Sequence, residues 1–123
     1  MRGQLTLPAQ LRLRRKSDFD ATHAQGRRMG DALFGVTVRL NEAGQPRLGM
    51  AVAVRAAGSS VERNRIRRII RESFRLHQHE IPALDIVVSA RARARHAPGR
   101  ELHASLAALW KKVTEQCATS PRS

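Results

Sequence analysis

The sequence predicts an α+β fold in which three helices pack on a small, mostly antiparallel sheet. Apolar residues gather into strand-like segments at 33–40, 47–55 and 83–89. Two other segments, 61–78 and 101–116, repeat their apolar residues with the period of a helix. Such mixing of strands and helices along a short chain indicates the α+β class.

The first helix is expected to begin near Ser17 and to end at Gly26. The Ser17 hydroxyl can cap this helix, and Asp18 and Asp20 would then stand near the positive end of its dipole. Phe19 is the one strongly apolar residue on its inner face. The helix is therefore expected to be short and only weakly amphipathic.

Two strands are expected next. Residues 33–40 alternate apolar and polar side chains, as Val36 and Val38 do with Thr37. Residues 41–46 contain Asn, Gly and Pro and predict a turn. Residues 47–55 are apolar on both faces at their centre, which predicts a strand inside the sheet. A hairpin between the two strands is the economical pairing.

The second half of the chain is expected to form a helix, a strand and a helix. The helix at 61–78 is kept apart from the strand by Pro82. A basic connector, 91–100, follows the strand and leads into the last helix, 101–116. The residues alone therefore give the order α-β-β-α-β-α.

Length and charge constrain the class of partner. The 123 residues fit one domain spanning 1–123, with residues 1–10 and 117–123 expected to be flexible. Lys and Arg number 23 against 10 Asp and Glu, so the net charge is +13. A polyanion would relieve this self-repulsion and release counterions. The charge predicts a nucleic-acid partner, with an anionic membrane surface as the alternative.

The sequence also indicates a cytoplasmic protein. It has no apolar run of about 18 residues that would span a membrane, and its N-terminus lacks the apolar core of a signal peptide. The single cysteine, Cys117, excludes an internal disulfide.

The helix at 61–78 carries the most specific functional signal. At about 100° per residue, polar residues fall on one stripe and Ile66, Ile69 and Ile70 fall opposite. The members of the stripe are Asn64, Arg67, Arg68, Arg71 and Arg75. Aligned guanidiniums repel one another, and a run of phosphates along the helix would neutralise them. The alternative is a solvated helix face, but such faces usually interleave acids, and this stripe has none.

No catalytic set is visible on the chain itself. The five histidines are scattered, the carboxylates are isolated, and no glycine-rich phosphate loop occurs. We therefore expect neither a catalytic residue nor a metal site on the protein alone.

Residues 63–75 resemble the RNR signature of the bacterial ribonuclease P protein component. Residues 16–19, 48–52 and 85–88 also resemble segments of that family, in the same order, so the resemblance covers about residues 11–115. It implies an α-β-β-β-α-β-α order with a left-handed βαβ crossover. A short strand near Arg55 would supply the strand that the residues alone do not show.

The resemblance implies a protein subunit that helps a catalytic RNA remove the 5′ leader of precursor tRNA. It implies Mg²⁺ bound mainly by the RNA, no organic cofactor, no membrane and no required protein partner. The partners would be the ribonuclease P catalytic RNA and precursor tRNA.

The resemblance also implies two groups of binding residues, and the spacing of arginines in the basic connector suggests a third. The RNA-binding helix would use Arg63, Asn64, Arg65, Arg67, Arg68 and Arg71, with Arg75 continuing the stripe. A leader cleft would include Phe19, Phe34 and Arg55, although ordinary core packing is the alternative for both rings. Arg91, Arg93 and Arg95 alternate, so on an extended chain they would form a second basic patch, or else a solvated loop.

Three other functions remain open from the residues. They are a structural RNA-binding protein such as a ribosomal protein, a DNA-binding module with the arginine helix in a major groove, and a protein-only nuclease. RNA-free cleavage would identify the last of these, and groove-specific duplex binding would identify the second.

Overall fold

The computed structural model describes residues 11–13, 15–53 and 58–118, and it shows an α+β fold. The helices and strands are α1 (Lys16–Gln25), β1 (Arg27–Gly30), β2 (Phe34–Leu40), β3 (Arg47–Ala51), α3 (Ser60–His77), β4 (Leu84–Ala90) and α4 (Gly99–Ala118). Two 3₁₀ turns, η3 (Gln78–Glu80) and η4 (Ala92–His96), follow α3 and β4. The expected order α-β-β-β-α-β-α is confirmed.

The sheet has four strands in the order β1-β2-β4-β3. β2 pairs antiparallel with both β1 and β4, whereas β3 pairs parallel with β4. The predicted hairpin between the segments that form β2 and β3 is therefore wrong, because β4 lies between them. Every residue of β4 except Ser89 is buried, and so apolar a strand belongs at the centre of the sheet.

The strand that the residues alone did not show is β1, whereas the short strand expected near Arg55 falls on residues that the structure does not describe. β1 has four residues, Arg27–Gly30, and no alternation of apolar and polar side chains that would have predicted it. It forms the hairpin with β2 through register pairs such as Met29 with Val36. Arg55 itself lies outside the described residues.

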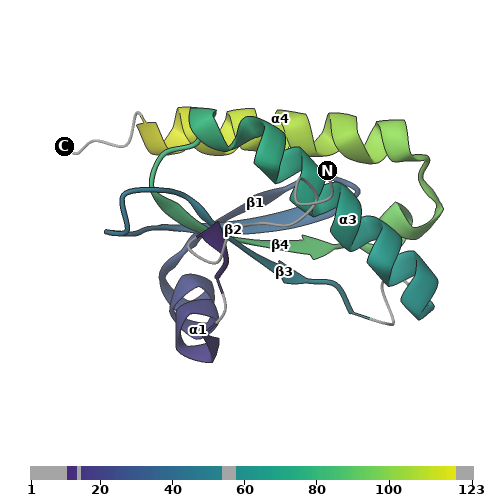
Figure 1. Ribbon diagram of the computed structural model, residues 1–123, viewed down its shortest axis with the longest axis horizontal. Helices are drawn as coiled ribbons and strands as arrows, with labels where there is room; N and C mark the ends of the chain where they lie inside the picture. The colour runs from purple at the N-terminus through teal and green to yellow at the C-terminus, as the bar shows by residue number, and fades with distance from the viewer. Residues whose placement is uncertain (1–10, 14, 54–57, 119–123) are drawn as a thin grey trace, which may run out of the picture.

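The two faces of the sheet have different covers (Figure 1). α3 and α4 lie on one face, where Phe34, Val36, Ile86 and Val88 join the hydrophobic core. α1 lies on the opposite face and covers only part of it (Figure 1). β3, α3 and β4 form a βαβ unit between neighbouring parallel strands. Its left hand stays a prediction.

The helix ends differ from expectation at two places. α1 begins at Lys16 with Arg15 as its N-cap and no side-chain cap, so Ser17 lies inside the helix and the predicted Ser17 cap is wrong. At α3 a serine does cap the helix, because the Ser59 hydroxyl accepts a hydrogen bond from the Glu62 backbone N–H at 3.3 Å. α4 continues to Ala118, so residues 117 and 118, expected in a flexible tail, are helical. Residues 1–10 and 119–123 lie outside the described part.

One polar contact ties α3 to α4 inside the core. The Trp110 indole N–H donates to the Ser73 hydroxyl at 2.8 Å, and the Trp110 ring meets Phe74 edge to face with centroids 5.8 Å apart. No helix in the described part of the chain is long and apolar enough to cross a membrane.

Replacing Ser73 with alanine should lower the free energy of unfolding by about 1–2 kcal/mol, because the buried indole N–H loses its acceptor. Urea unfolding measures this change. Ser17→Ala, on the exposed side of α1, serves as the control and should change the value by less than about 0.5 kcal/mol. Equal effects of the two changes would mean that the Trp110 contact contributes nothing.

Candidate nucleic-acid interface

α3 separates its apolar and basic side chains as its period predicts. Ile66, Ile70 and Phe74 are fully buried against the core, and Ile69 is 8% exposed. On the other side Asn64 and Arg68 are exposed, while Arg67, Arg71 and Arg75 are half-buried. The predicted faces of the helix are therefore confirmed. Contact of this stripe with RNA stays a prediction.

The acids of α3 do not neutralise the stripe. Glu72 lies 3.5 Å from the His103 ring on α4, and Glu62 lies 3.8 Å from the Arg65 guanidinium. Partial burial, together with the charges of Arg67, Arg68 and Arg12, lowers the pKa of Arg71 below its usual value. These arginines form a cationic cluster whose mutual repulsion an anion would relieve.

Arg12 is a member of this cluster that the sequence analysis missed. Residues 11–13 lie along the edge of β3, where the Leu13 N–H donates to the Leu48 carbonyl at 2.8 Å and Arg12 forms a parallel bridge with Leu48. Leu11 and Leu13 are buried, whereas Arg12 is exposed. The alternation Leu-Arg-Leu was the signal for this strand-like segment.

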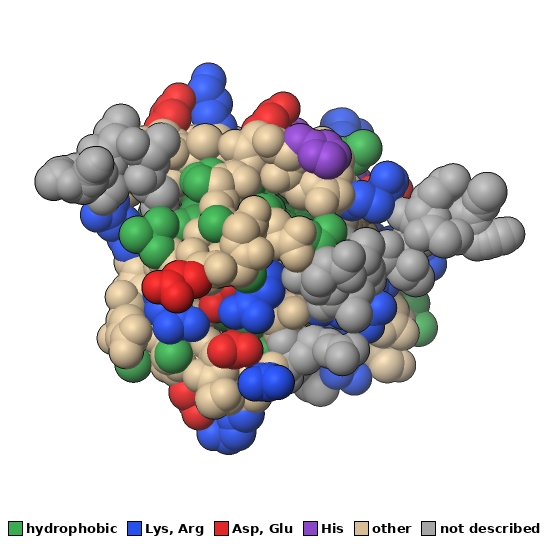
Figure 2. Space-filling view, turned by 60° about the vertical axis from the view of Figure 1, so that its left-hand side comes forward, with side chains coloured by type: hydrophobic (Ala, Val, Ile, Leu, Met, Phe, Trp, Pro, Cys, Tyr) green, Lys and Arg blue, Asp and Glu red, His purple; other side chains and the backbone are tan. Residues whose placement is uncertain are grey.

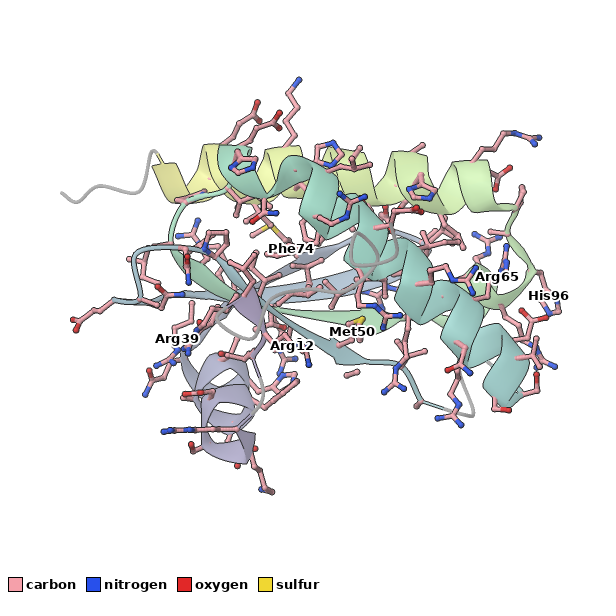
Figure 3. All side chains as sticks on the ribbon, in the orientation of Figure 1. Arg12, Arg39, Met50, Arg65, Phe74 and His96 are labelled. Atoms are coloured by element: carbon pink, nitrogen blue, oxygen red, sulfur yellow. The ribbon has the colours of Figure 1, made fainter. Side chains whose placement is uncertain are left out.

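Arg65 differs from the other arginines of α3. Its guanidinium donates to the Ala97 carbonyl at 2.6 Å, which ties α3 to the connector before α4. Figure 3 shows Arg65 and His96 at the same end of the molecule. Arg63 is half-buried in the first turn of α3, where the helix follows Ser59.

The basic connector is not extended, so the expectation that its arginines share one side is wrong. Residues 92–96 form the 3₁₀ turn η4, and at about three residues per turn Arg91, Arg93 and Arg95 point in different directions. Arg95 lies against Gly58, where a Cβ would come within 2.7 Å of the guanidinium, and the φ of +87° at Gly58 also favours glycine. Arg93 lines a hollow beside Leu33.

Arg91 reaches back over the sheet face that α1 leaves open. Its Nε donates to the Phe34 carbonyl at 3.4 Å, and its Nη2 lies 3.3 Å from where a Gly35 Cβ would stand. A cleft of about 290 Å³ lies here, with His23 of α1, Arg28 of β1, Thr37 of β2 and Arg91 among its walls. Two arginines and a histidine from three separate parts of the chain therefore border one groove beside α1.

The rings predicted for a leader cleft have separate positions. Phe19 is half-buried, and its ring lies over Gly49 of β3, where a Cβ would come within 2.6 Å of it. Phe34 is 0% exposed and packs in the core on the opposite face, so its assignment to the cleft is wrong and core packing holds. Arg55 lies outside the described residues. His23 and Arg28 at the cleft were not predicted.

A buried carboxylate on β4 links the ends of β2, β3 and β4 through hydrogen bonds. Asp85 of β4 is 0% exposed and accepts hydrogen bonds from Arg47 at 2.8 and 2.9 Å, Arg39 at 3.0 Å and Asn41 at 2.8 Å. Burial alone would raise the pKa of Asp85, but these donors hold it below the usual value. An aspartate inside an apolar strand was the only signal of this network in the sequence.

Several acidic side chains, among them Asp18, Asp20 and Glu62, pair with basic ones. Within residues 11–13, 15–53 and 58–118, no three His, Cys, Asp or Glu side chains group as metal ligands. In Figure 2 most acidic side chains lie next to basic ones. The chemistry available at this surface is therefore the binding of anions by guanidiniums.

The whole chain is similar to known proteins of one family. Residues 7–114 match the model of the family described as Ribonuclease P. The chain is 39% identical over 117 residues to the ribonuclease P protein component of Yersinia enterocolitica, covering 95% of this chain and 98% of the relative. It is 41% identical over 109 residues to that of Escherichia coli O157:H7, covering 89% and 92%. The solved RNase P protein of Staphylococcus aureus superposes with a TM-score of 0.79 at 32% identity, covering 83% of this chain and 94% of that one.

Proposed function

This chain belongs to the ribonuclease P protein family, and from that premise we propose how its surface serves as the protein subunit of a ribonuclease P that matures the 5′ end of tRNA. The stripe on α3, with Arg12 beside it, binds the phosphate backbone of the ribonuclease P RNA. The cleft beside α1 binds the single-stranded leader of precursor tRNA. The catalytic groups belong to the RNA.

The observation that carries the RNA-binding role is the cationic cluster of Arg12, Arg67, Arg68 and Arg71. Partial burial and like charge already lower the pKa of Arg71 in the free protein. Phosphates placed along the stripe would remove this repulsion and accept charge-assisted hydrogen bonds. Binding would also release counterions from the RNA. The protein is therefore built to gain stability from a polyanion.

The cleft beside α1 suits an unpaired strand of RNA. Its floor is the sheet around Gly35 and Thr37, and its cationic rim includes Arg28 and Arg91. His23 of α1 offers a ring face on which a base can stack. Backbone charge and stacking bind a leader without requiring one sequence.

Magnesium in this proposal is held mainly by the RNA. The carboxylates of Asp18 and Asp85 are paired with Arg47, and that of Glu62 with Arg65, instead of facing a common site. Bound Mg²⁺ would supply the activated nucleophile and stabilise the leaving group. The protein's own residues neutralise phosphates, so that catalytic RNA and substrate approach each other at a lower Mg²⁺ concentration.

The decisive experiment is cleavage of a precursor tRNA by the matching catalytic RNA at low Mg²⁺, with and without the protein. We expect the protein to restore cleavage at the mature 5′ end. Tight RNA binding without restored cleavage would contradict the proposal and indicate a structural RNA-binding protein. Cleavage by the protein without RNA would indicate a protein-only nuclease.

A further inference from the structure

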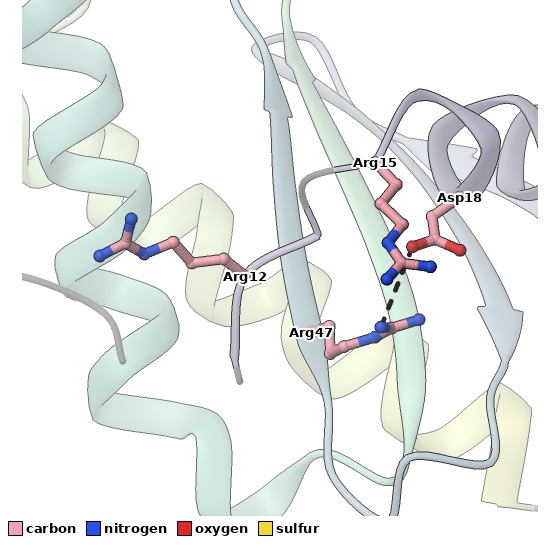
Figure 4. A pocket seen from close by; sticks show the side chains of 4 residues that line it. All are labelled: Arg12, Arg15, Asp18 and Arg47. Carbon is pink, nitrogen blue, oxygen red and sulfur yellow. Dashed lines mark ion pairs between the residues drawn. The ribbon is translucent and has the colours of Figure 1, made fainter. Parts of the chain in front are cut away.

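A second cationic hollow lies apart from the leader cleft, where α1 and β3 begin (Figure 4). It has a volume of about 480 Å³ and is lined by Arg12, Arg15, Asp18 and Arg47. The residues come from the strand-like segment on the β3 edge, the start of α1 and the start of β3. The guanidiniums of Arg15 and Arg47 therefore lie together with the Asp18 carboxylate, and Arg12 lines the hollow on the side of the β3 edge.

Two hydrogen bonds to Asp85 hold the Arg47 side chain in place beside this hollow. Its Nε and Nη2 atoms donate to the fully buried Asp85 carboxylate, at 2.8 and 2.9 Å. Its remaining nitrogen, Nη1, lies 4.0 Å from Asp18, an ion pair that Figure 4 marks. A guanidinium held by a two-bond contact loses little side-chain freedom when it binds a ligand. Asp85 and Asp18 thus act as positioning residues for Arg47.

Arg15 supplies the charge that lacks a partner. Among the described residues, its guanidinium has no hydrogen bond or ion pair, and in Figure 4 it points toward Arg47 and Asp18. Arg15 is also the N-cap of α1, which has no side-chain cap. The positive end of the α1 dipole therefore adds to the field in the hollow.

Arg12 connects the hollow with the stripe on α3. Its backbone is held beside Leu48, while its side chain points toward α3 and away from Arg15 (Figure 4). Its charge contributes to the lowered pKa of Arg71. A track of guanidiniums thus runs from α3 across the β3 edge to the start of α1.

We propose that Arg15 and Arg47 form a binding site for a backbone phosphate of RNA at the start of α1, and that Arg12 connects this site with the stripe on α3. The site takes phosphodiesters without regard to base, because it offers guanidiniums and a helix end but no aromatic ring. It extends the RNA path beyond the α3 stripe. The inference rests on the proposed function, and the phosphate comes either from the catalytic RNA or from the precursor.

The test uses the full-length Arg15→Gln variant, because this side chain has no partner in the described structure whose loss would weaken the fold. We expect RNA affinity at physiological salt to fall about 5- to 10-fold, and the slope of log K against log salt concentration to flatten by about 0.7–0.9. Arg100→Gln, at an exposed position on α4, is the matched control and should leave both values unchanged.

Two arms identify the source of the phosphate. A loss seen with catalytic RNA alone assigns it to that RNA. A loss seen only when the holoenzyme binds precursor tRNA with a long leader assigns it to the precursor. No difference between Arg15→Gln and Arg100→Gln in either arm overturns the site. If Arg68→Gln still weakens RNA binding in that case, the proposed function stands without it.

Discussion

Replacing Arg67, Arg68 and Arg71 together with glutamine should weaken binding to the ribonuclease P RNA about 100- to 1,000-fold at physiological salt. Each lost phosphate contact also removes a released counterion, so the slope of log K against log salt concentration should flatten by about 2–3. At low Mg²⁺ the variant should fail to restore precursor cleavage. Filter binding across a salt series, with cleavage assays beside it, measures both results.

The same variant should be at least as stable as the unsubstituted protein. Burial and the neighbouring arginines lower the pKa of Arg71, which means that the folded state disfavours its charge. Thermal unfolding of the free protein therefore separates a binding defect from a folding defect.

A matched control removes the same net charge elsewhere. Arg100, Lys111 and Lys112 are exposed on α4, away from the stripe, and their replacement by glutamine should change affinity far less. If the two triple variants lose affinity equally, overall charge rather than the α3 stripe determines binding, and the assigned surface is wrong.

The second large effect is expected at Asp85. Asp85→Asn keeps the shape of the side chain but leaves Arg47 and Arg39 without their buried partner. Breaking such a pair from one side should lower the free energy of unfolding by about 3 kcal/mol near neutral pH. Urea unfolding measures this, with Asp20→Asn as the control. Asp20 pairs with Lys16 on the surface, so the control should change stability by less than about 1 kcal/mol.

The pH dependence of this difference has a definite sign. Because the folded-state pKa of Asp85 lies below its usual value, its stabilisation is present above the unfolded-state pKa of about 3.9. It is lost as the pH falls through the lower, folded-state pKa. The unsubstituted protein and Asp85→Asn should therefore converge in stability below about pH 4. A constant difference down to pH 2 would show that the Asp85 charge is not what stabilises the fold.

The helices and the arginine stripe were predictable because their signals are local. Ile66, Ile69 and Ile70 repeat with the helical period, and that period fixed which side chains of α3 would be buried. Strand partners are not local. The pairing of β2 with β4 brings Arg39 opposite Asp85. No feature of residues 33–55 predicts this pairing.

For the candidate site, too, only the residues with local sequence signals were predictable. The arginines of α3 follow from periodicity, whereas Arg12 and Arg47 join the surface only because distant segments pack together. Phe34 was predicted to line the cleft but is buried in the core. The sequence does not distinguish the two positions, because an aromatic residue at the start of a strand can face either the core or a cleft. The 3₁₀ turn η4 likewise redirected Arg91, Arg93 and Arg95 away from a common side.

The central place of β4 also sets the order in which the sheet is completed during synthesis. The β1–β2 hairpin is made from neighbouring residues and can form early. Within the described part of the chain, β3 pairs with β4 and, through Leu48, with residues 11–13, so it can join the sheet only after α3 and residues 84–90 have been made. We therefore expect the docking of β3 on β4 to be a late step in the folding of the sheet.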